Sequence, residues 1–364
     1  MCKVTISIPV YNVRNGIRRS LNSALNQSYK DIEVLVIDDK GTDGSMKIVD
    51  EIMSTHPRGD LVRIIDHQYN KGTGAARNSA IENAKGDYLF FLDADDVIKT
   101  NCIEIMVGAI LRTKAQIVSS NYVKCNEELK IISFSHEMKY NGSLSLFDYR
   151  FRYGGDWPVF TWNKLYDIFF LRRNNIFCIP HHLCEDVYFD FLITVFCKRF
   201  VVVRKYTYAY VENSQSLNSG GFTKKLAVMY YEAIEKEHEF MQSCSIIRTE
   251  DKILLAILLL KQIQYYIMRI VNSQLISDED KKNMVDNGYK LISILISHYN
   301  IPNSDDYSAM IDDYNQTKFS GTFINHIINN PYITNKLVKR KWRERRIYSI
   351  IDRYRLKFGS SFRI

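Results

Sequence analysis

The stretch Tyr88-Leu-Phe-Phe-Leu92-Asp93-Ala-Asp95-Asp96 places three carboxylates directly after an apolar run. The run is short and rich in aromatic and aliphatic residues, which predicts a buried β-strand. Carboxylates at the end of a buried strand are costly unless a cation neutralises them. Mg²⁺ or Mn²⁺, held by one or two carboxylates and by substrate phosphates, would do so. A helix cap, made by Asp95 or Asp96 on a helix expected near Thr100–Arg112, is an equally good interpretation of the acidic residues alone.

Strand and helix patterns alternate on both sides of this stretch. Short runs rich in Val, Ile and Leu predict buried strands at Val4–Val10, Glu33–Ile37, Val62–Ile65, Tyr88–Leu92 and Gln116–Ser119. Helical patterns lie between them, at Ile17–Gln27, Ser45–Thr55, Thr73–Ala84 and Thr100–Arg112. This alternation predicts an α/β domain whose mostly parallel sheet is flanked by helices on both faces.

Polar side chains follow three of the predicted strands at the point where each strand ends. Tyr11 follows the first strand, Asp38 and Asp39 follow the second, and Asp93 follows the fourth. Open parallel sheets bind their ligands at the carboxyl ends of their strands. We therefore expect these side chains to lie along one edge of the sheet and to form a site there.

The chain of 364 residues exceeds the usual size of one domain. From Phe222 the pattern becomes helical, with helices expected at Asp251–Val271 and Met284–Tyr299 and a sequence resembling a capping box at Ser277–Asp280. Asn, Ser and Gly gather at Leu217–Gly221 and mark a boundary. We predict three parts: an α/β domain at 1–217, a helical C-terminal region at 218–331 and a basic amphipathic tail at 332–364.

The composition is that of an ordinary globular protein, with 46% hydrophobic and 25% charged residues. The seven cysteines are odd in number and form no Cys-x-x-Cys pair, so we expect free thiols in a reducing cytoplasm. Met1-Cys-Lys3 runs directly into a strand, so we expect no signal peptide. The longest apolar run, Ile253–Leu260, is too short to span a bilayer, which favours a soluble or peripheral protein.

The predicted tail is strongly basic. Residues 336–357 carry ten Lys or Arg, against Glu344 and Asp352, and apolar residues such as Trp342 are interleaved. A basic helix with an apolar stripe is typical of a helix that lies on an anionic membrane. A charged helix that packs its stripe on the rest of the protein fits equally well. One basic helix is thin support for nucleic-acid binding, so no nucleic-acid partner is expected.

Two glycine turns lead into predicted helices. The segment Asp38–Ser45 lacks the spacing of a P-loop, and it fits either a carboxylate that accepts from a nucleobase or a simple capped turn. In Asn70–Asn78 the pattern Gly72-x-Gly-x-x-Arg77 departs from a dinucleotide fingerprint and argues little for NAD. Lys71 and Arg77 are candidates to meet a diphosphate at the start of the helix.

A pair of carboxylates, Glu185 and Asp186, precedes the apolar run Val187-Tyr-Phe189. One of them could act as a general base beside a metal–phosphate site, although acidic residues are also favoured at a helix start. The neighbouring segment Cys178–Cys184 reads Cys-x-x-His-His-x-Cys, a spacing that matches no common closed zinc site.

Together these motifs resemble family 2 glycosyltransferases of the GT-A fold. The segments that carry the resemblance are, in chain order, Ser7–Asn12, Val36–Asp39, Asn70–Gly72, Ala76–Asn78, Leu92–Asp96, Trp162–Tyr166 and Glu185–Val187. Their order and spacing resemble those of the family over about residues 3–215. The resemblance implies a Rossmann-like GT-A domain and does not cover the helical region or the tail.

The resemblance also implies roles for individual residues. The donor, a nucleotide-diphosphate sugar such as a UDP-sugar, would be bound by Pro9, Val10, Tyr11, Asp38, Asp39, Lys71, Gly72, Arg77, Asn78, Asp93 and Ala94. Mn²⁺ or Mg²⁺ would be bound by Asp95 with Asp93. The catalytic base would be Asp186, with Glu185 as the second choice. The acceptor and sugar side would be shaped by Trp157, Trp162 and Lys164.

The implied reaction is a single displacement with inversion at the anomeric carbon. The metal would stabilise the departing nucleoside diphosphate while the base deprotonates an acceptor hydroxyl. The expected acceptor is a glycan or lipid-linked glycan of surface polysaccharide synthesis, met in the cytoplasm at the inner face of the cell membrane. The alternatives are a non-catalytic nucleotide-sugar-binding scaffold, against which the intact carboxylates argue, and a nucleotidyltransferase, which would not need Asp186.

Two positions depart from the family pattern. Lys40 stands where relatives often have glycine after the paired aspartates, so the local turn and the base contact are in question. Around Tyr208–Ser214 relatives often carry a basic residue near the diphosphate. Glu212 stands there in this chain, and no role is assigned to it.

Overall fold

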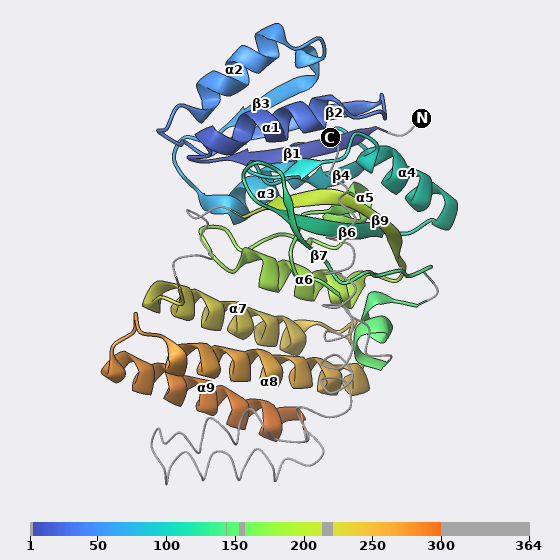
Figure 1. The fold of residues 1–364 in the computed structure, drawn as a ribbon. Helices are drawn as coiled ribbons and strands as arrows, with labels where there is room; N and C mark the ends of the chain where they lie inside the picture. Colours follow the sequence, from blue (N-terminus) through green and yellow to red (C-terminus); the bar gives the residue numbers. More distant parts are fainter. Residues whose placement is uncertain (1–2, 143, 153–156, 213–220, 300–364) are drawn as a thin grey trace. The chain divides into compact units, whose positions relative to one another are not determined.

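The computed structural model of the chain describes residues 3–142, 144–152, 157–212 and 221–299 (Figure 1). These residues divide into two compact units, one before residue 215 and one after it. The first is an α/β unit and the second is a group of helices. The predicted boundary near residue 217 and the basic tail at 332–364 lie outside the described residues.

The α/β unit contains nine strands among its described residues. They are β1 (Val4–Val10), β2 (Ile32–Asp38), β3 (Val62–Asp66), β4 (Tyr88–Phe91), β5 (Val97–Ile98), β6 (Ile117–Cys125), β7 (Ile131–Phe134), β8 (Lys164–Asp167) and β9 (Phe200–Val211). The α-helices are α1 (Arg14–Leu25), α2 (Ser45–Thr55), α3 (Gly72–Asn83), α4 (Cys102–Thr113), α5 (Ile168–Arg173) and α6 (Glu185–Phe196). Short helical turns lie at Gly59–Leu61 and Asp148–Arg152.

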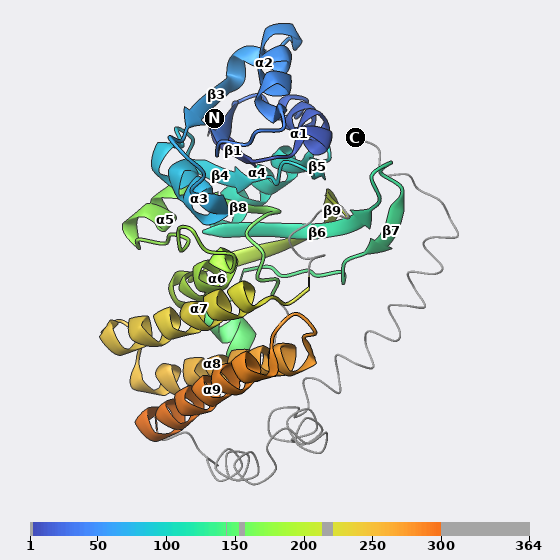
Figure 2. The same cartoon turned by 90° about the vertical axis from the view of Figure 1, so that its left-hand side faces the viewer.

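The strands form one mixed sheet in the order β3-β2-β1-β4-β8-β6-β9-β5, with β7 paired to β6. Strand β1 pairs in parallel with β2 and β4, and β6 pairs in parallel with β9. Strand β8 lies antiparallel between β4 and β6, so β4 and β6 run in the same direction (Figure 2). The carboxyl ends of β1, β2, β4, β6 and β9 therefore meet at one edge of the sheet.

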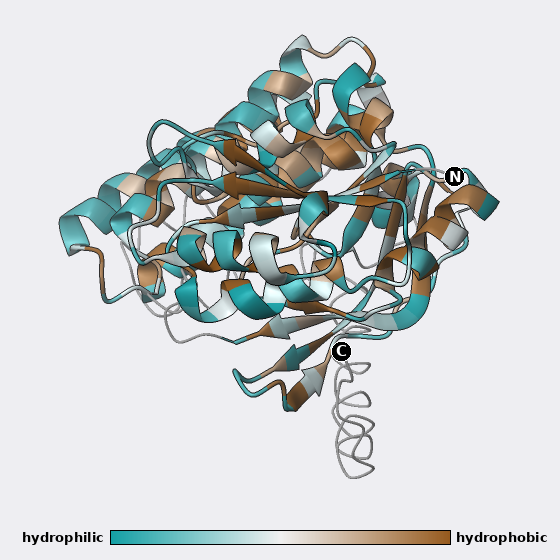
Figure 3. Ribbon diagram, turned by 90° about the horizontal axis from the view of Figure 1, so that it is seen from above, coloured by the Kyte–Doolittle hydropathy of each residue, from teal (hydrophilic) through white to brown (hydrophobic). Residues whose placement is uncertain are grey.

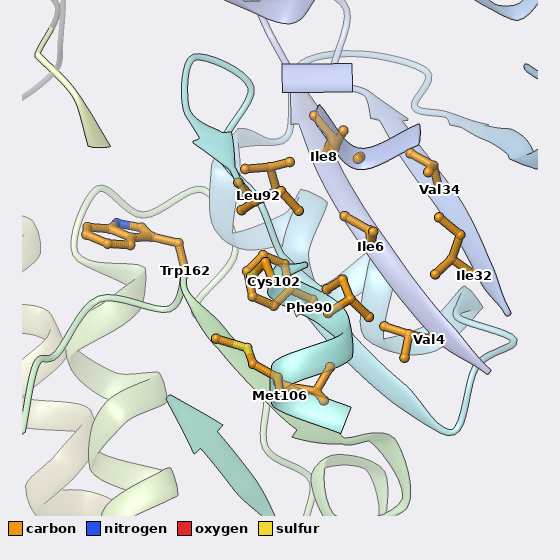
Figure 4. Packing of buried hydrophobic residues seen from close by; sticks show 14 of the residues in the cluster. Val4, Ile6, Ile8, Ile32, Val34, Phe90, Leu92, Cys102, Met106 and Trp162 are labelled. Atoms are coloured by element: carbon orange, nitrogen blue, oxygen red, sulfur yellow. The ribbon is translucent and has the colours of Figure 1, made fainter. Parts of the chain in front are cut away.

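The core explains why the central strands are apolar almost without interruption. Val4, Ile6 and Ile8 of β1 are fully buried and lie beside Val34 of β2 and Phe90 of β4 (Figure 4). Burial of each such side chain stabilises the fold by about 1.5–3 kcal/mol relative to exposure. In Figure 3 the central strands are correspondingly brown, while teal residues are frequent on the surrounding helices.

The predicted alternation of strands and helices is confirmed through α4. Strand β1 and helix α2 occupy their predicted ranges. Strand β6 extends beyond its prediction, because it continues through buried polar residues that the sequence did not mark as strand. Ser120 donates to Asn163 Oδ1 at 2.8 Å, and Asn121 Oδ1 accepts from the backbone N–H of Met138 at 2.8 Å. The described cysteines are free thiols, as predicted.

The helical unit comprises α7 (Lys224–Ser243), α8 (Thr249–Asn272) and α9 (Asp278–Tyr299) among the described residues. The Ser277 hydroxyl accepts from the backbone N–H of Asp280 at 3.2 Å, which confirms the predicted cap of α9. Helix α8 contacts both α7 and α9. Its segment Asp251–Val271 is, within the described chain, the one helix long and apolar enough to cross a membrane, and half of that segment is buried.

Candidate active site

The carboxyl edge of the sheet carries most of the residues that the sequence predicted for the donor. Tyr11, just beyond β1, is 47% exposed, whereas Val10 is buried and Pro9 is partly buried. Asp38 ends β2, and Asp93 lies two residues beyond β4. The strand order therefore brings these segments to one edge, as expected from parallel strands.

Asp39 fixes the turn that begins helix α3. One carboxylate oxygen accepts from the backbone N–H of Lys71 and the other from that of Gly72, each at 2.8 Å. The ring of His67 lies 2.7 Å from the first of these oxygens. Gly72 has a φ of +82°, a conformation that glycine adopts without penalty. Asp39 is 2% exposed, so it positions Lys71 and Gly72 from within the fold.

Lys40, which departs from the family pattern, is in the left-handed region with a φ of +62°. This conformation costs a non-glycine residue about 1–2 kcal/mol. Its backbone N–H donates to Asp38 Oδ1 at 2.9 Å, and its Nζ lies 3.4 Å from Asp38 Oδ2 and also pairs with Asp66. Lys40 thus adopts the backbone conformation that glycine would adopt, and its ammonium group forms ion pairs with the last residues of β2 and β3.

Helix α1 holds the backbone of the Asp93-Ala-Asp95 turn. Arg19 Nε donates to the Asp95 carbonyl at 3.0 Å, and the Ser20 hydroxyl donates to the Asp93 carbonyl at 3.1 Å. A Cβ atom at Gly16 would lie 2.6 Å from the Cα of Asp95, so only glycine fits against the turn. Ala94, between the two aspartates, is buried.

Asp96 has a structural task on the opposite side of the turn. Its carboxylate is 1% exposed and accepts from the Tyr208 hydroxyl at 2.6 Å and from the backbone N–H of Val211 at 2.8 Å. The capping hypothesis for Asp95 and Asp96 is wrong, because helix α4 has Asn101 at its N-cap position. Asp96 instead ties the acidic turn to strand β9.

The environment of Asp95 suits a cation. Burial raises the pKa of Asp95 to about 6, and the neighbouring charge of Asp93 adds to the effect. Among the described residues no three or more His, Cys, Asp or Glu side chains gather into a metal cluster, and this includes the Cys178–Cys184 segment. The acidic turn thus offers a metal ion two carboxylates, those of Asp93 and Asp95. Mg²⁺ and Mn²⁺ fit such a partial set, because phosphates and water complete their coordination.

Arg77 is a buried cation at the centre of the site. Its Nη2 donates to Asp93 Oδ1 at 3.1 Å, and its Nη1 donates to Glu185 Oε1. The Arg77 side chain is 6% exposed. Burial opposes its charge, but Asp93 and Glu185 raise the pKa of Arg77 above its ordinary value. The guanidinium therefore joins the end of β4 to the start of α6.

Glu185 and Asp186 begin helix α6 and differ in their partners. Burial raises the pKa of Glu185 to about 7, against the opposing effect of its partner Arg77. Burial also raises the pKa of Asp186, Arg77 opposes it, and the nearby Asp190 raises it further. Within the described residues no salt bridge involves Asp186. Of the two carboxylates, only that of Glu185 is paired with a cation in the described part of the chain.

The residues predicted for the acceptor side are more buried than a binding surface requires. Trp157 is 5% exposed, and its Nε1 donates to Asp190 Oδ1 at 2.8 Å. Lys164 is 1% exposed, and its Nζ donates to the carbonyl oxygens of Pro158, at 3.0 Å, and Phe160. Burial lowers the pKa of Lys164 to about 7. Both side chains hold the 157–164 loop in shape.

Trp162 lies in the core rather than at the surface. Its ring stacks on Phe160, with centroids 3.6 Å apart, and on Tyr208, with centroids 4.7 Å apart (Figure 4 shows Trp162). It is 9% exposed. Because Tyr208 bonds to Asp96, this stack connects the 157–164 loop to the acidic turn.

Asn78, another of the predicted donor residues, bonds to the backbone of Cys178. Its side-chain amide donates to the Cys178 carbonyl at 2.9 Å and accepts from the Cys178 N–H at 2.7 Å. Tyr208, Arg19 and Asp190 also take part in the contacts described above, and none of them was predicted from the sequence. The one signal in the sequence was the aromatic composition of the strand that contains Tyr208.

A segment of the α/β unit matches a known protein family. Residues 5–178 match the model of the family described as Glycosyl transferase family 2. This part of the chain is a glycosyltransferase family 2 domain. The predicted family is confirmed for these residues.

Curated relatives share sequence with parts of the chain. Identity is 31% over 226 residues with Glycosyltransferase GlyA of Streptococcus pneumoniae, covering 59% of this chain and 31% of that protein. It is 35% over 140 residues with an uncharacterized glycosyltransferase of Haemophilus influenzae, covering 38% of this chain and 55% of that protein. Identity is 32% over 162 residues with hyaluronan synthase of Pasteurella multocida, covering 44% of this chain and 14% of that protein. The chain thus spans about a third of the first relative and about half of the second.

Solved structures show the same fold. The crystal structure of S. aureus TarS 1–349 in complex with UDP-GlcNAc gives a TM-score of 0.70 at 18% identity, covering 91% of each chain. A second structure of TarS 1–349 gives a TM-score of 0.62 at 18% identity, covering 88% of this chain and 93% of that one. The prediction of a GT-A fold followed by helices is thereby confirmed.

Proposed function

We propose that the protein transfers a sugar from a nucleoside-diphosphate sugar, a UDP-sugar, to a hydroxyl group of a glycan or lipid-linked glycan. The observation that carries the proposal is the junction of the Asp93-Ala-Asp95 turn with the Glu185–Asp186 pair through the buried Arg77. The family of the domain supports sugar transfer. Hyaluronan synthase and chondroitin synthase among the relatives support a role in surface polysaccharide synthesis.

The donor nucleotide would bind over the ends of β1 and β2. The exposed ring of Tyr11 offers a face on which a base can stack, and such stacking contributes about 1–3 kcal/mol per base. Asp38 lies at the same edge, and the turn at Lys71 and Gly72 begins helix α3, whose N-terminus favours phosphate. The UDP-GlcNAc complex of TarS, a protein of like fold, supports a uridine nucleotide.

Mn²⁺ or Mg²⁺ would be held by Asp95 and Asp93. When bound, the ion acts as a Lewis acid that neutralises the charge developing on the departing diphosphate. The raised pKa of Asp95 fits this role, because a nearby cation would relieve the cost of ionising a buried carboxylate beside Asp93.

Asp186 would accept the proton of the acceptor hydroxyl. As that proton leaves, the hydroxyl oxygen forms a bond to the anomeric carbon from the face opposite the diphosphate, and the bond from that carbon to the diphosphate oxygen breaks. The configuration at this carbon therefore inverts. Glu185 is less suited to the task, since its carboxylate is held by Arg77. A base with a raised pKa is a better proton acceptor near neutral pH.

A donor screen tests the proposal. The protein is incubated with Mn²⁺ and UDP-glucose, UDP-galactose, their N-acetylamino and uronic acid counterparts, or GDP-mannose, and the released products are identified. Release of UDP is the expected result. Release of pyrophosphate would indicate nucleotidyl transfer, and binding without release would indicate a scaffold; either result would contradict the proposal.

We further propose a cytoplasmic protein that is peripheral at the inner face of the cell membrane. The basic sequence at 336–357 motivates this proposal. Removal of residues 332–364 should weaken binding to vesicles that contain anionic phospholipid and leave binding to neutral vesicles unchanged. Equal binding to anionic vesicles with and without these residues would contradict the membrane contact.

A further inference from the structure

We propose that Arg77 is a positioning residue that sets the spacing between the donor-side carboxylate Asp93 and the acceptor-side pair that starts at Glu185. The inference rests on the proposed function of the site. It gives Arg77 a different task from the diphosphate contact that the family resemblance implies.

The geometry of the guanidinium carries the inference. Its two terminal nitrogens donate to carboxylates on two different elements, which lie 16 and 108 residues away in sequence. A guanidinium is planar, and its donors form a rigid fork. The distance between the two carboxylates is therefore fixed by the width of one side chain. A lysine ammonium carries the same charge but lacks this fork.

The burial of Arg77 leaves little access for a phosphate. The side chains of Arg77 and Glu185 are 6% and 11% exposed, while that of Asp93 is 26% exposed. The Nε of Arg77 is buried and has no hydrogen-bond partner among the residues that the structure describes. Both terminal nitrogens already bond to carboxylates, and the 6% exposure of the side chain leaves little surface through which a diphosphate could reach their remaining N–H groups.

Neighbouring residues of α3 strengthen the connection to α6. Gly74 lies against the segment before α6, since a Cβ at this position would be 2.3 Å from the Ile179 carbonyl and 3.0 Å from the Cβ of Glu185. Asn78 binds the backbone of Cys178 through both atoms of its amide. Helix α3 therefore contacts this segment at three points, and Asp186, which follows Glu185, is placed by the same contacts.

The charge of Arg77 gives the inference a distinctive consequence. A cation bonded to Asp93 opposes the binding of a metal ion to that carboxylate. Loss of the guanidinium should therefore leave Mn²⁺ binding unchanged or tighter, while transfer falls because the two carboxylate groups are no longer spaced correctly. A diphosphate ligand would behave differently, because its loss would weaken UDP binding.

The test compares Arg77→Lys, Arg77→Met and Glu185→Gln with the wild type. Mn²⁺ binding is measured from the electron paramagnetic resonance of free Mn²⁺, UDP binding by calorimetry, and transfer as kcat and donor KM. For Arg77→Lys we expect kcat to fall by about ten-fold or more and donor KM to change by less than about three-fold. For Arg77→Met we expect Mn²⁺ affinity at least equal to that of the wild type.

A double-mutant cycle adds a readout that does not depend on one variant. If Arg77 and Glu185 act as one unit, Glu185→Gln should lower kcat in the wild type but have little further effect in Arg77→Met. Additive losses would overturn the inference. A ten-fold rise in donor KM with kcat unchanged in Arg77→Lys would also overturn it and would favour a diphosphate contact.

Two further outcomes separate this inference from the proposed function. If the wild type releases no nucleoside diphosphate from any donor, the proposed function fails, and the Mn²⁺ comparison decides whether Arg77 opposes the metal as inferred. If Arg77→Met does not fold, Arg77→Lys and Glu185→Gln, with thermal unfolding as the check of folding, decide the outcome. Weaker Mn²⁺ binding in a folded Arg77→Lys protein would contradict the inference.

Discussion

The hydroxyl of Tyr208 lies 2.6 Å from a carboxylate oxygen of Asp96, to which it donates. The same hydroxyl oxygen accepts the backbone N–H of Asp93 at 3.3 Å. Both Tyr208 and Asp96 are buried, and 112 residues separate them in sequence. Strand β9 thus holds the acidic turn through Tyr208, while helix α1 holds the backbone of the same turn through Arg19 and Ser20.

Tyr208→Phe should therefore disturb both stability and transfer. The substitution removes one hydrogen bond to a buried carboxylate and one to the Asp93 backbone, and a loss of this kind costs about 1–3 kcal/mol. Urea unfolding measures the stability, and UDP release measures the transfer. Tyr206→Phe, on the same strand but only partly buried, is the matched control and should change both much less. Equal effects of the two substitutions would contradict the role of Tyr208.

Gly16→Ala should impair the acidic turn although alanine favours helices. A Cβ at this position would lie 2.6 Å from the Cα of Asp95 and 2.8 Å from the Ala94 carbonyl, so the turn must shift. We expect weaker Mn²⁺ binding and slower transfer. Gly108→Ala in helix α4 is the control, because its Cβ would have no neighbour within 4 Å; it should stabilise the protein by about 0.5–1 kcal/mol. Normal Mn²⁺ binding in Gly16→Ala would refute the close contact.

Asp186→Asn should abolish transfer and preserve donor binding. An amide cannot take the proton of the acceptor hydroxyl, and the loss of a general base lowers rates by about 10²–10⁴-fold. Calorimetry with UDP and Mn²⁺ checks that the donor side is intact. Glu185→Gln should lower transfer less, since it affects only positioning. Transfer at the wild-type rate in Asp186→Asn would remove the residue from its proposed role.

The transfer rate should depend on pH through the Glu185–Asp186 pair. Burial raises the pKa of Asp186 above its ordinary value, and the base works only when ionised, so kcat should fall as the pH is lowered through this raised pKa. Because the two carboxyls interact, the apparent value belongs to the pair. In Glu185→Gln one neighbouring negative charge is lost, so the fall should occur at lower pH. A profile with the same midpoint in both proteins would contradict this coupling.

The sequence predicted those parts of the fold whose signals are local. The buried strands β1 and β2 appear as continuous apolar runs, and Ser277 caps α9 within three residues. Strand β8 gave no such signal, because it is four residues long and begins with the buried Lys164. Lys164 can be buried because its Nζ donates to the carbonyl oxygens of Pro158 and Phe160 in the preceding loop. No pattern of hydrophobic residues predicts such partners.

The members of the candidate site were proposed from the sequence, whereas the contacts that join them were not. The chain order of the motifs pointed to Asp93, Asp95 and Asp186. The partners of Arg77 are two carboxylates on other elements, and one of them lies 108 residues away. Only the fold reveals such a contact, because a buried arginine and a solvated one look the same in sequence. The burial of Trp162 escaped prediction for the same reason.

The most direct measurement follows UDP release and product formation in one reaction, using the donor found by the screen and an acceptor glycan. Wild type with Mn²⁺, wild type with EDTA and Asp95→Asn with Mn²⁺ are compared. We predict release by the first, with a β-linked product from an α-linked donor, and loss of both signals in the other two. Undiminished transfer by Asp95→Asn, or an α-linked product, would contradict metal-assisted inverting transfer at this edge of the sheet.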